Sequence, residues 1–230
     1  MSKAFENNNR HIKKALVLGF HTPAFLSVIR SLGRGGIQVH VAWFRPDSIA
    51  IYSRYVYKTH DIPPYSTDSS EWKDALIELM KKEAFDLVIP CHDEMVVPIQ
   101  RHKDELEKYG RLYVINDESF DVLFNKVKTG HLARALGVNM PDEIVVSDMD
   151  NICEPLSKLG FPLVLKPYMS YRDTDPPTRI NVEIVSNEED YYGYMEMMLR
   201  HGPVAVQKYF RGRGVGVNLL MKEGTPLMVF

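Results

Sequence analysis

The hydrophobic positions in the first half of the chain alternate between short continuous runs and helical spacings. Continuous apolar runs predict strands that are buried on both faces of a sheet. They are Ala15–Gly19, Ile37–Ala42, Asp86–Pro90 and Leu112–Ile115. Between these runs, apolar residues three or four positions apart predict helices over residues 23–32, 71–82 and 95–109. The alternation predicts a doubly wound α/β domain, in which helices cover both faces of a parallel sheet.

The first of these helices has a defined start and end in the sequence. Thr22 can accept hydrogen bonds from the first helical amides, and Pro23 suits the first helical position. Gly33, Gly35 and Gly36 follow the last apolar position and are expected to end the helix.

The pattern changes near Asn116, where an α+β arrangement replaces the strand and helix alternation. We expect helices over residues 119–124, 127–136, 151–159 and 187–199, and strands over residues 143–146, 162–166, 180–185 and 204–209. A polar loop at Tyr168–Thr178 contains two prolines and is expected to be irregular. The predicted organisation is a disordered tail over residues 1–14, a first domain over 15–115 and a second over 116–230.

The chain is expected to end in a hairpin of residues 215–221 and 226–230. Its last strand, Leu227–Phe230, is apolar, and an apolar strand of this kind should be paired or covered. We therefore expect more chain to follow, so that the second domain is incomplete at its C-terminus.

Composition and charge exclude several classes of protein. The longest uncharged apolar runs are far shorter than the roughly 20 residues that span a bilayer, and Met1–Lys14 has no apolar signal-peptide core. Cys91 and Cys153 are the only cysteines, too few for a disulfide framework or a metal knuckle. The net charge of −2, with scattered basic residues, does not suit a nucleic-acid binder. We expect a cytoplasmic protein without membrane or nucleic-acid partners.

Common nucleotide-binding motifs are absent. No Gly-x-x-x-x-Gly-Lys-Ser/Thr loop occurs, which excludes a P-loop nucleotidase. Leu18-Gly19-Phe20 follows the first strand as a dinucleotide fingerprint would, but the second and third glycines of that fingerprint are missing.

Three other segments of the second region carry candidate chemistry. Asn125-Lys126 opens a helix, Gly160–Pro167 forms a strand that places Lys166 at its end, and Val204–Phe210 forms a strand with a polar end. Lysines at a helix start and a strand end can bind a triphosphate as point charges. The backbone groups of a strand end can pair with the edge of an adenine ring.

Each segment also has an ordinary structural interpretation. Lys126 alone is typical of a solvated helix residue, and Lys166 of a surface lysine whose stem packs while its amine reaches water. Gln207-Lys208 could be the polar end of an edge strand. Spacing alone leaves both interpretations open.

The order of the three segments resembles the nucleotide-binding half of the ATP-grasp superfamily. The matching residues are Asn125-Lys126, Ala135-Leu-Gly-Val138 with Pro141, Gly160-Phe-Pro-Leu-Val-Leu-Lys-Pro167 and Val206-Gln-Lys-Tyr-Phe210. The chain is particularly similar to carboxylate–amine ligases grouped with carbamoyl phosphate synthase-like and biotin carboxylase-like proteins. The resemblance covers roughly residues 15–230 and implies a pre-ATP-grasp α/β domain followed by an ATP-grasp domain.

The resemblance implies roles for individual residues. Lys126 and Lys166 match the two lysines that contact phosphates, and Gln207 lies where the family places a residue near the adenine amino group. Lys208, Tyr209 and Phe210 match the hinge whose backbone addresses the adenine ring. ATP would phosphorylate a small carboxylate, and an amine would attack the acyl phosphate. No catalytic side chain is assigned.

Two features of the chain depart from the family. The loop after Lys166 lacks the usual glycines, so Arg172 or Arg179 would have to supply charge to the phosphates. The family's magnesium ligands lie on strands that would follow Phe230, and we assign no metal ligand within the chain. We therefore expect this chain to be inactive alone.

His92-Asp93-Glu94 follows a buried strand, at the edge where open α/β sheets bind ligands. These residues are candidates for substrate contact, or they form a helix N-terminus in which the acids favour the helix dipole.

Two other functions remain open at this point. The chain could be a non-catalytic nucleotide-binding module, or a subunit that needs another chain. It could also be a small-molecule-binding doubly wound protein whose second region is only structural. A homodimer is an additional expectation.

Overall fold

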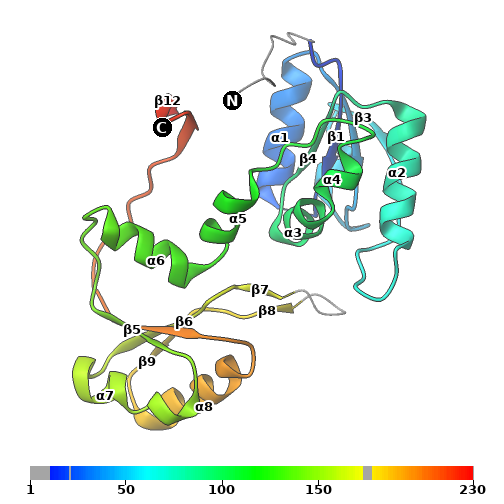
Figure 1. Cartoon of the computed structure of the whole chain (residues 1–230). Coiled ribbons are helices and arrows are strands. Elements are labelled where there is room, and N and C mark those ends of the chain that lie inside the picture. Colours follow the sequence, from blue (N-terminus) through cyan, green and yellow to red (C-terminus); the bar gives the residue numbers. More distant parts are fainter. Residues whose placement is uncertain (1–10, 21, 173–177, 230) are drawn as a thin grey trace. The chain divides into compact units, whose positions relative to one another are not determined.

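The computed structural model describes residues 11–20, 22–172 and 178–229, so most of the expected tail lies outside the described residues. Internal contacts divide the chain into two compact units (Figure 1). The first consists of Met1–Thr129 with Met169–Asn181, and the second of Gly130–Tyr168 with Val182–Phe230. The domain boundary near residue 115 stays a prediction.

The first unit contains a parallel sheet with the strand order β3-β2-β1-β4. Its strands are β1 (Lys14–Leu18), β2 (Gln38–Ala42), β3 (Val56–Thr59) and β4 (Leu87–Pro90). Three of them were predicted. β3 was not, because an edge strand that is mostly exposed has no continuous apolar run. The predicted strand at Leu112–Ile115 is wrong, since only a single bridge joins Leu112 to Val88.

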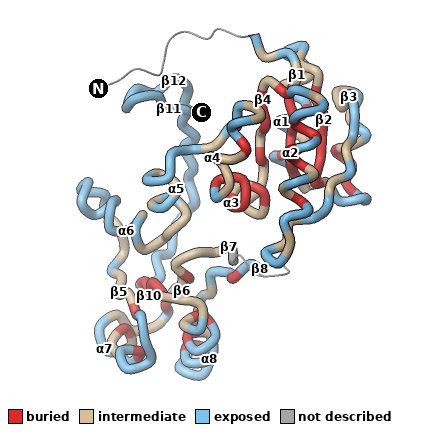
Figure 2. The backbone as a smooth tube through the Cα atoms, turned by 45° about the vertical axis from the view of Figure 1, so that its right-hand side comes forward, coloured by how far each residue is buried: buried red, intermediate tan, exposed pale blue. Residues whose placement is uncertain are grey.

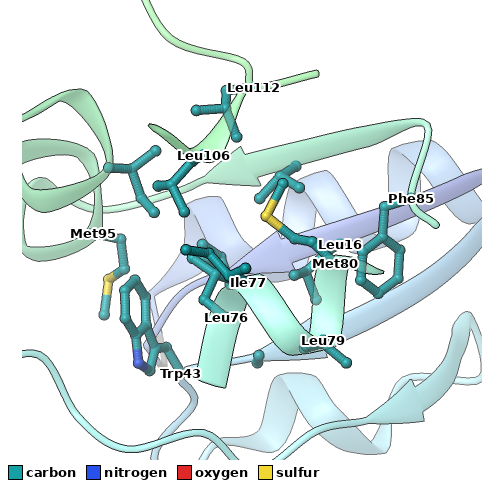
Figure 3. Close-up of a cluster of buried hydrophobic side chains, with 14 of the residues drawn as sticks. Leu16, Trp43, Leu76, Ile77, Leu79, Met80, Phe85, Met95, Leu106 and Leu112 are labelled. Carbon is teal, nitrogen blue, oxygen red and sulfur yellow. The ribbon is translucent and has the colours of Figure 1, made fainter. Parts of the chain in front are cut away.

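Helices cover both faces of this sheet, which confirms the predicted fold class. On one face, α1 (Pro23–Arg34) packs Phe25 and Ile29 against Val17, Val39 and Val41. On the other face lie α2 (Glu71–Glu83), α3 (Asp93–Arg101) and α4 (Lys103–Leu106). Their buried side chains pack around Leu16, Leu18 and Val88. Figure 3 shows Leu76 and Met80 of α2 and Met95 of α3 in this cluster with Leu16.

The ends of the helices follow their sequence signals, with one exception. Thr22 caps α1, and its Oγ1 accepts a hydrogen bond from the Phe25 amide at 3.3 Å. The single helix predicted over residues 95–109 is wrong. It begins at Asp93, is interrupted at His102 and continues as α4, and Pro98 within α3 lacks an amide donor.

The second unit contains an antiparallel sheet with the order β5-β10-β6-β9. Its strands are β5 (Glu143–Val146), β6 (Leu163–Pro167), β9 (Glu183–Val185) and β10 (Val204–Lys208). The helices α7 (Glu154–Leu159) and α8 (Glu188–Leu199) contact these strands. Leu163 pairs with Val185 and Leu165 with Val206, and these four side chains are buried on one face.

The remaining elements are short or exposed (Figure 2). They are η1 (Ile49–Tyr52), α5 (Asp117–Leu123), α6 (Lys126–Ala135), η2 (Met149–Asn151), β7 (Tyr171–Arg172), β8 (Thr178–Arg179), β11 (Leu219–Lys222) and β12 (Thr225–Val229). The loop at Tyr168–Thr178 is not wholly irregular as expected, because β7 and β8 pair at its ends. β11 and β12 form the expected hairpin, and their residues are exposed. No described helix is both long and apolar enough to cross a bilayer.

Candidate functional site

Lys166 and Gln207 lie side by side on neighbouring strands of the second unit. Lys166 pairs with Ala205, and Gln207 pairs with Val164. Directly paired residues share a face and successive residues of a strand lie on opposite faces, so Lys166 and Gln207 lie on the face opposite Leu165 and Val206. The Lys166 Nζ donates a hydrogen bond to the Gln207 Oε1 at 2.7 Å. The structure thus brings together two of the residues that the sequence singled out.

Gln207 is 7% exposed and is held on both sides. Its Nε2 donates to the Glu143 Oε2 at 3.2 Å, and the Glu143 Oε1 accepts from the Arg134 guanidinium at 3.2 Å. Glu143 pairs directly with Gln207 across β5 and β10. Glu143 and Arg134 were not predicted, because their contacts depend on which strands and helices are neighbours. The network fixes the Gln207 amide with its oxygen toward Lys166.

The backbone amides of residues 208–210, at the end of β10 and just after it, differ in whether they donate a hydrogen bond within the protein. The Lys208 amide donates to the Asp142 carbonyl at 2.8 Å, and the Tyr209 amide donates to the Pro162 carbonyl at 3.1 Å. Within the described part of the chain, no backbone carbonyl accepts from the Phe210 amide. Both Tyr209 and Phe210 are exposed.

The Lys208 side chain has a structural partner. Lys208 pairs with Leu163, so its side chain lies on the face that α7 and α8 cover. Its Nζ donates to the carbonyl of Leu159 and, at 3.3 Å, to that of Gly160. These carbonyls end α7, so the lysine satisfies acceptors that a helix leaves unpaired. Only the backbone of Lys208 remains a candidate for contact with a ligand.

Lys126 belongs to the first unit, where it begins α6. The Asn125 Oδ1 accepts from the amides of Val127 and Lys128, both at 3.1 Å, which fixes the start of this helix. The Lys126 Nζ donates to the Ser170 Oγ. Ser170 lies in the loop after β6. This loop therefore contacts Lys126, one of the two lysines predicted to bind phosphate.

A cavity of about 220 Å³ adjoins Lys126, and we call it the lysine cavity. Its lining consists of Asp93, Leu123, Phe124, Lys126, Met169, Ser170, Tyr171 and Arg179. It brings together Lys126 and Arg179, both predicted to meet phosphate, with Asp93, predicted to meet substrate. Arg172 lies in β7, but its side chain is outside the described residues.

Tyr171 contributes a hydroxyl to the lysine cavity. Its side chain is buried, and its Oη has no hydrogen-bond partner among the described residues. Burial, together with the carboxylates of Glu94 and Asp93, raises the pKa of Tyr171 to about 12. The hydroxyl therefore stays protonated at neutral pH and can donate a hydrogen bond to a ligand. A buried polar group without a partner is rare in proteins and suggests that a ligand or water completes it.

The candidate substrate residues His92, Asp93 and Glu94, which follow β4 and Cys91, do not share one site. His92 caps α3, and its Nδ1 accepts from the Glu94 amide at 3.4 Å, as the helix N-terminus interpretation expects. Asp93 lines the lysine cavity. Glu94 lines a second cavity, described next.

This second cavity, which we call the edge cavity, measures about 310 Å³ and lies at the carboxyl ends of the parallel strands. It is lined by Phe20, Trp43, Phe44, Pro46, Asp61, Ile62, Pro64, Tyr65, Glu94 and Met95. Trp43 has a left-handed backbone, with φ at 55°, and its Nε1 donates to the Pro63 carbonyl at 2.7 Å. A bulky residue in this conformation is strained, and such strain concentrates at ligand sites. Asp61 and Glu94 give the lining two carboxylates, and no lysine or arginine is among its described residues.

Curated proteins match this chain over only part of its length. No protein-family model matches the chain. D-alanine–D-alanine ligase A of Bacillus cereus is 27% identical over 112 residues, which cover 48% of this chain and 35% of the ligase. The carbamoyl phosphate synthase large chain of Saccharolobus solfataricus is 26% identical over 140 residues, which cover 59% of this chain and 13% of the synthase. The chain thus spans about a third or less of the length of these relatives.

Solved structures match over most of the chain. The biotin carboxylase domain of Hydrogenobacter thermophilus 2-oxoglutarate carboxylase, in complex with MgADP and bicarbonate, matches with a TM-score of 0.65 at 16% identity, over 87% of this chain and 45% of that one. N5-carboxyaminoimidazole synthetase of Staphylococcus aureus matches with a TM-score of 0.62 at 15% identity, over 90% of this chain and 47% of that one. Identities this low show the fold alone. Over most of its length the chain therefore shares the fold of these carboxylase and synthetase structures, and over about half of its length it is similar in sequence to the ligase and the synthase.

Proposed function

We propose that the chain is the ATP-binding part of a ligase that activates a carboxylate as an acyl phosphate for attack by an amine. The observation that supports this most strongly is the Lys166–Gln207 pair at 2.7 Å, on the sheet face opposite α7 and α8. A lysine and a side-chain amide are fixed on one face, and shortly beyond the strand lies the Phe210 amide, which meets no backbone carbonyl among the described residues. This arrangement suits a nucleotide whose phosphates and base need different partners.

The adenine end of the nucleotide is assigned to the end of β10. Gln207 would meet the adenine amino group, and the Phe210 amide would donate to a ring nitrogen. The amides of Lys208 and Tyr209 are engaged within the protein, which leaves Phe210 as the donor of this segment. Glu143 would act as a positioning residue, because it fixes the Gln207 amide without touching the nucleotide.

Each unit is assigned an anion-binding group of its own. In the second unit Lys166 would bind phosphate. In the first unit Lys126, Arg179 and the Tyr171 hydroxyl would bind an anion in the lysine cavity. In the reaction, a carboxylate oxygen attacks the γ-phosphorus and ADP leaves. The amine nitrogen then attacks the acyl carbon and releases inorganic phosphate. The lysines would stabilise the negative charge of the transferring phosphoryl group.

Magnesium is implied only by the family. The described residues of the lysine cavity offer one carboxylate, that of Asp93, beside two cationic side chains. Magnesium binds through carboxylates, phosphates and waters in a near-octahedral shell, and the two cations oppose it here. These residues do not fit the ion, and we derive no step through it.

The edge cavity suits an amine better than a carboxylate. Asp61 and Glu94 would repel a carboxylate but attract an ammonium group. Aromatic rings such as those of Phe20 and Tyr65 can also stabilise a cation that lies over them. We assign the edge cavity to an amine-bearing substrate, and the carboxylate to the lysine cavity.

Calorimetric titration with ATP tests the proposal. Lys166→Met and Lys126→Met should each weaken binding by roughly tenfold to a hundredfold, the range expected when a hydrogen bond to a charged group is lost. Lys158→Met and Lys128→Met are matched controls, because these lysines pair with Glu154 and Asp121 and should not affect binding. Unchanged ATP affinity in both Lys166→Met and Lys126→Met would overturn the proposal.

A further inference from the structure

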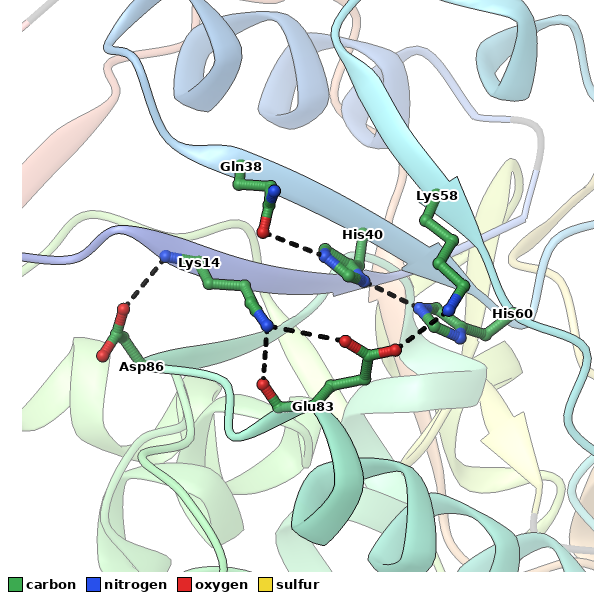
Figure 4. Close-up of polar contacts among 7 residues, drawn as sticks. All are labelled: Lys14, Gln38, His40, Lys58, His60, Glu83 and Asp86. Carbon is green, nitrogen blue, oxygen red and sulfur yellow. Dashed lines mark hydrogen bonds and ion pairs between the residues drawn. The ribbon is translucent and has the colours of Figure 1, made fainter.

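Two histidines and a glutamate meet in the first unit, from three elements that are distant in sequence (Figure 4). His40 lies in β2, His60 directly follows β3 and Glu83 ends α2. One ligand atom from each lies within 4.8 Å of the other two. The His40 Nδ1 and the His60 Nε2 are 2.7 Å apart. Neither cavity described above includes these residues.

The imidazole of His40 is held as a metal-binding histidine would be. Its Nε2 lies 3.4 Å from the Gln38 Oε1, and Gln38 is on the same face of β2. Metal-bound histidines almost always donate their second ring nitrogen to such an acceptor, which fixes the tautomer and leaves the first nitrogen for the metal. The Phe85 ring packs edge-on against His40, with centroids 5.1 Å apart, and holds the imidazole plane.

Both histidines are neutral at neutral pH. Burial lowers the pKa of His40 to about 4, with a further lowering from His60. Burial also lowers the pKa of His60, and Lys58 adds to this effect. The neutral ring is the form that binds metal, so no proton has to be removed from an imidazolium before binding.

Two lysines compete for the carboxylate of this trio. The Lys58 Nζ lies 3.0 Å from the Glu83 Oε1, and the Lys14 Nζ lies 3.5 Å from the Oε2. Lys14 is also held by the Glu83 carbonyl at 2.8 Å. The Lys58 side chain is 48% exposed and can turn into solvent, so it is the lysine that a cation would displace.

We propose that His40, His60 and Glu83 form a binding site for a divalent first-row transition-metal ion of the zinc class, which displaces Lys58 from Glu83. Two imidazoles and one carboxylate are a common ligand set for such ions, and they leave at least one coordination position open. These three ligands were not predicted from the sequence, because they form no local spacing motif and β3 was not predicted.

Binding requires a small adjustment of the trio. Two nitrogens on one tetrahedral zinc ion are roughly 3.3 Å apart, since each bond is about 2.0 Å long. The histidine nitrogens must therefore separate by roughly half an ångström, and the Glu83 carboxylate must turn from Lys58 toward them. His60 lies beyond the end of an edge strand and is only half-buried, so it has room for this shift.

Titration of the whole chain with Co²⁺, read by its visible absorption, tests the site. Zn²⁺ should then displace Co²⁺ in a competition titration. His60→Gln and Glu83→Gln should each weaken Co²⁺ binding at least tenfold. His131→Gln is the matched control, because His131 is an exposed histidine of α6 and should leave binding unchanged.

Lys58→Gln distinguishes the site from a chance histidine pair. Removing a positive charge beside the carboxylate should tighten Co²⁺ binding by about tenfold. Circular dichroism of each variant checks that it is folded, and the Lys58→Gln result stands even if a ligand variant fails to fold. The proposal is overturned if Co²⁺ binding is absent in the unaltered chain, if it persists in His60→Gln and Glu83→Gln, or if Lys58→Gln does not strengthen it.

Discussion

The two four-stranded sheets of the molecule differ in which of their faces are covered by helices. In the first unit, helices pack on both faces of a parallel sheet, so residues 15–18 of β1 are all fully buried. In the second unit, α7 and α8 contact a sheet in which β6 alternates between buried and half-buried residues, although β10 is buried from Val204 to Gln207. The first sheet therefore has its cavities at the ends of its strands, while the second presents polar residues on a face.

This difference determines which partners a polar side chain in a strand can have. In a sheet buried on both faces, a polar side chain such as His40 needs partners inside the protein, and Gln38 and His60 provide them. On the face opposite α7 and α8, Lys166 donates a hydrogen bond to Gln207, and we propose that this pair meets the nucleotide. Lys208, only one residue further, points to the other face and holds a helix end.

The largest expected effect comes from shortening buried side chains. Leu16→Ala and Val17→Ala, on opposite faces of β1, should lower the free energy of unfolding by about 3 and about 2 kcal/mol. Leu165→Ala in β6 should also cost about 3 kcal/mol, whereas Val164→Ala should cost about 1 kcal/mol or less. Urea denaturation measures all four. Equal losses for Leu165→Ala and Val164→Ala would show that the second sheet is covered on both faces.

A smaller effect separates the two lysines of the second sheet. Lys208→Met should cost about 1 kcal/mol of stability, because the last carbonyls of α7 lose their donor. It should leave ATP affinity nearly unchanged, since only the Lys208 backbone faces a ligand in our proposal. Lys166→Met should weaken ATP binding and leave stability nearly unchanged. Thermal denaturation and calorimetry on both variants measure the contrast, and a shared loss of ATP affinity would contradict it.

Another expected effect is a pH dependence of the stability of the first unit. The pKa of His40 is lowered to about 4, and burial also lowers the pKa values of His60 and His102. The unfolded chain therefore binds more protons, so the stability of the unit should fall as the pH drops from about 6.5 toward 4. Urea denaturation across this range, with a chelator present, measures the loss. In His60→Gln the slope should be shallower, and an unchanged slope would contradict the assignment.

Much of the fold could be predicted, because local patterns decide it. The continuous runs of β1, β2 and β4 and the cap at Thr22 are properties of neighbouring residues. β3 could not be predicted in the same way, since the sheet rather than its own residues stabilises it. The break at His102 and the short pairing of β7 with β8 also depend on contacts outside each segment.

The sequence could nominate residues for the candidate site, whose roles stay predictions, but it could not predict their connections. The order of motifs identified Lys126, Lys166 and Gln207. The partners Glu143, Ser170 and Tyr171 required knowledge of which strands and loops are neighbours. The same holds for the His40–His60–Glu83 trio, whose members are 20 or more positions apart.

Amide hydrogen exchange, measured by NMR with and without ATP, tests the central claim most directly. If adenine binds at the end of β10, ATP should slow exchange of the Phe210 amide. The amides of Lys208 and Tyr209, already bonded within the protein, should change less. Protection of Phe210 that disappears in Lys166→Met would be the predicted result. Exchange that is unchanged at residues 207–210 in the presence of saturating ATP would contradict the account.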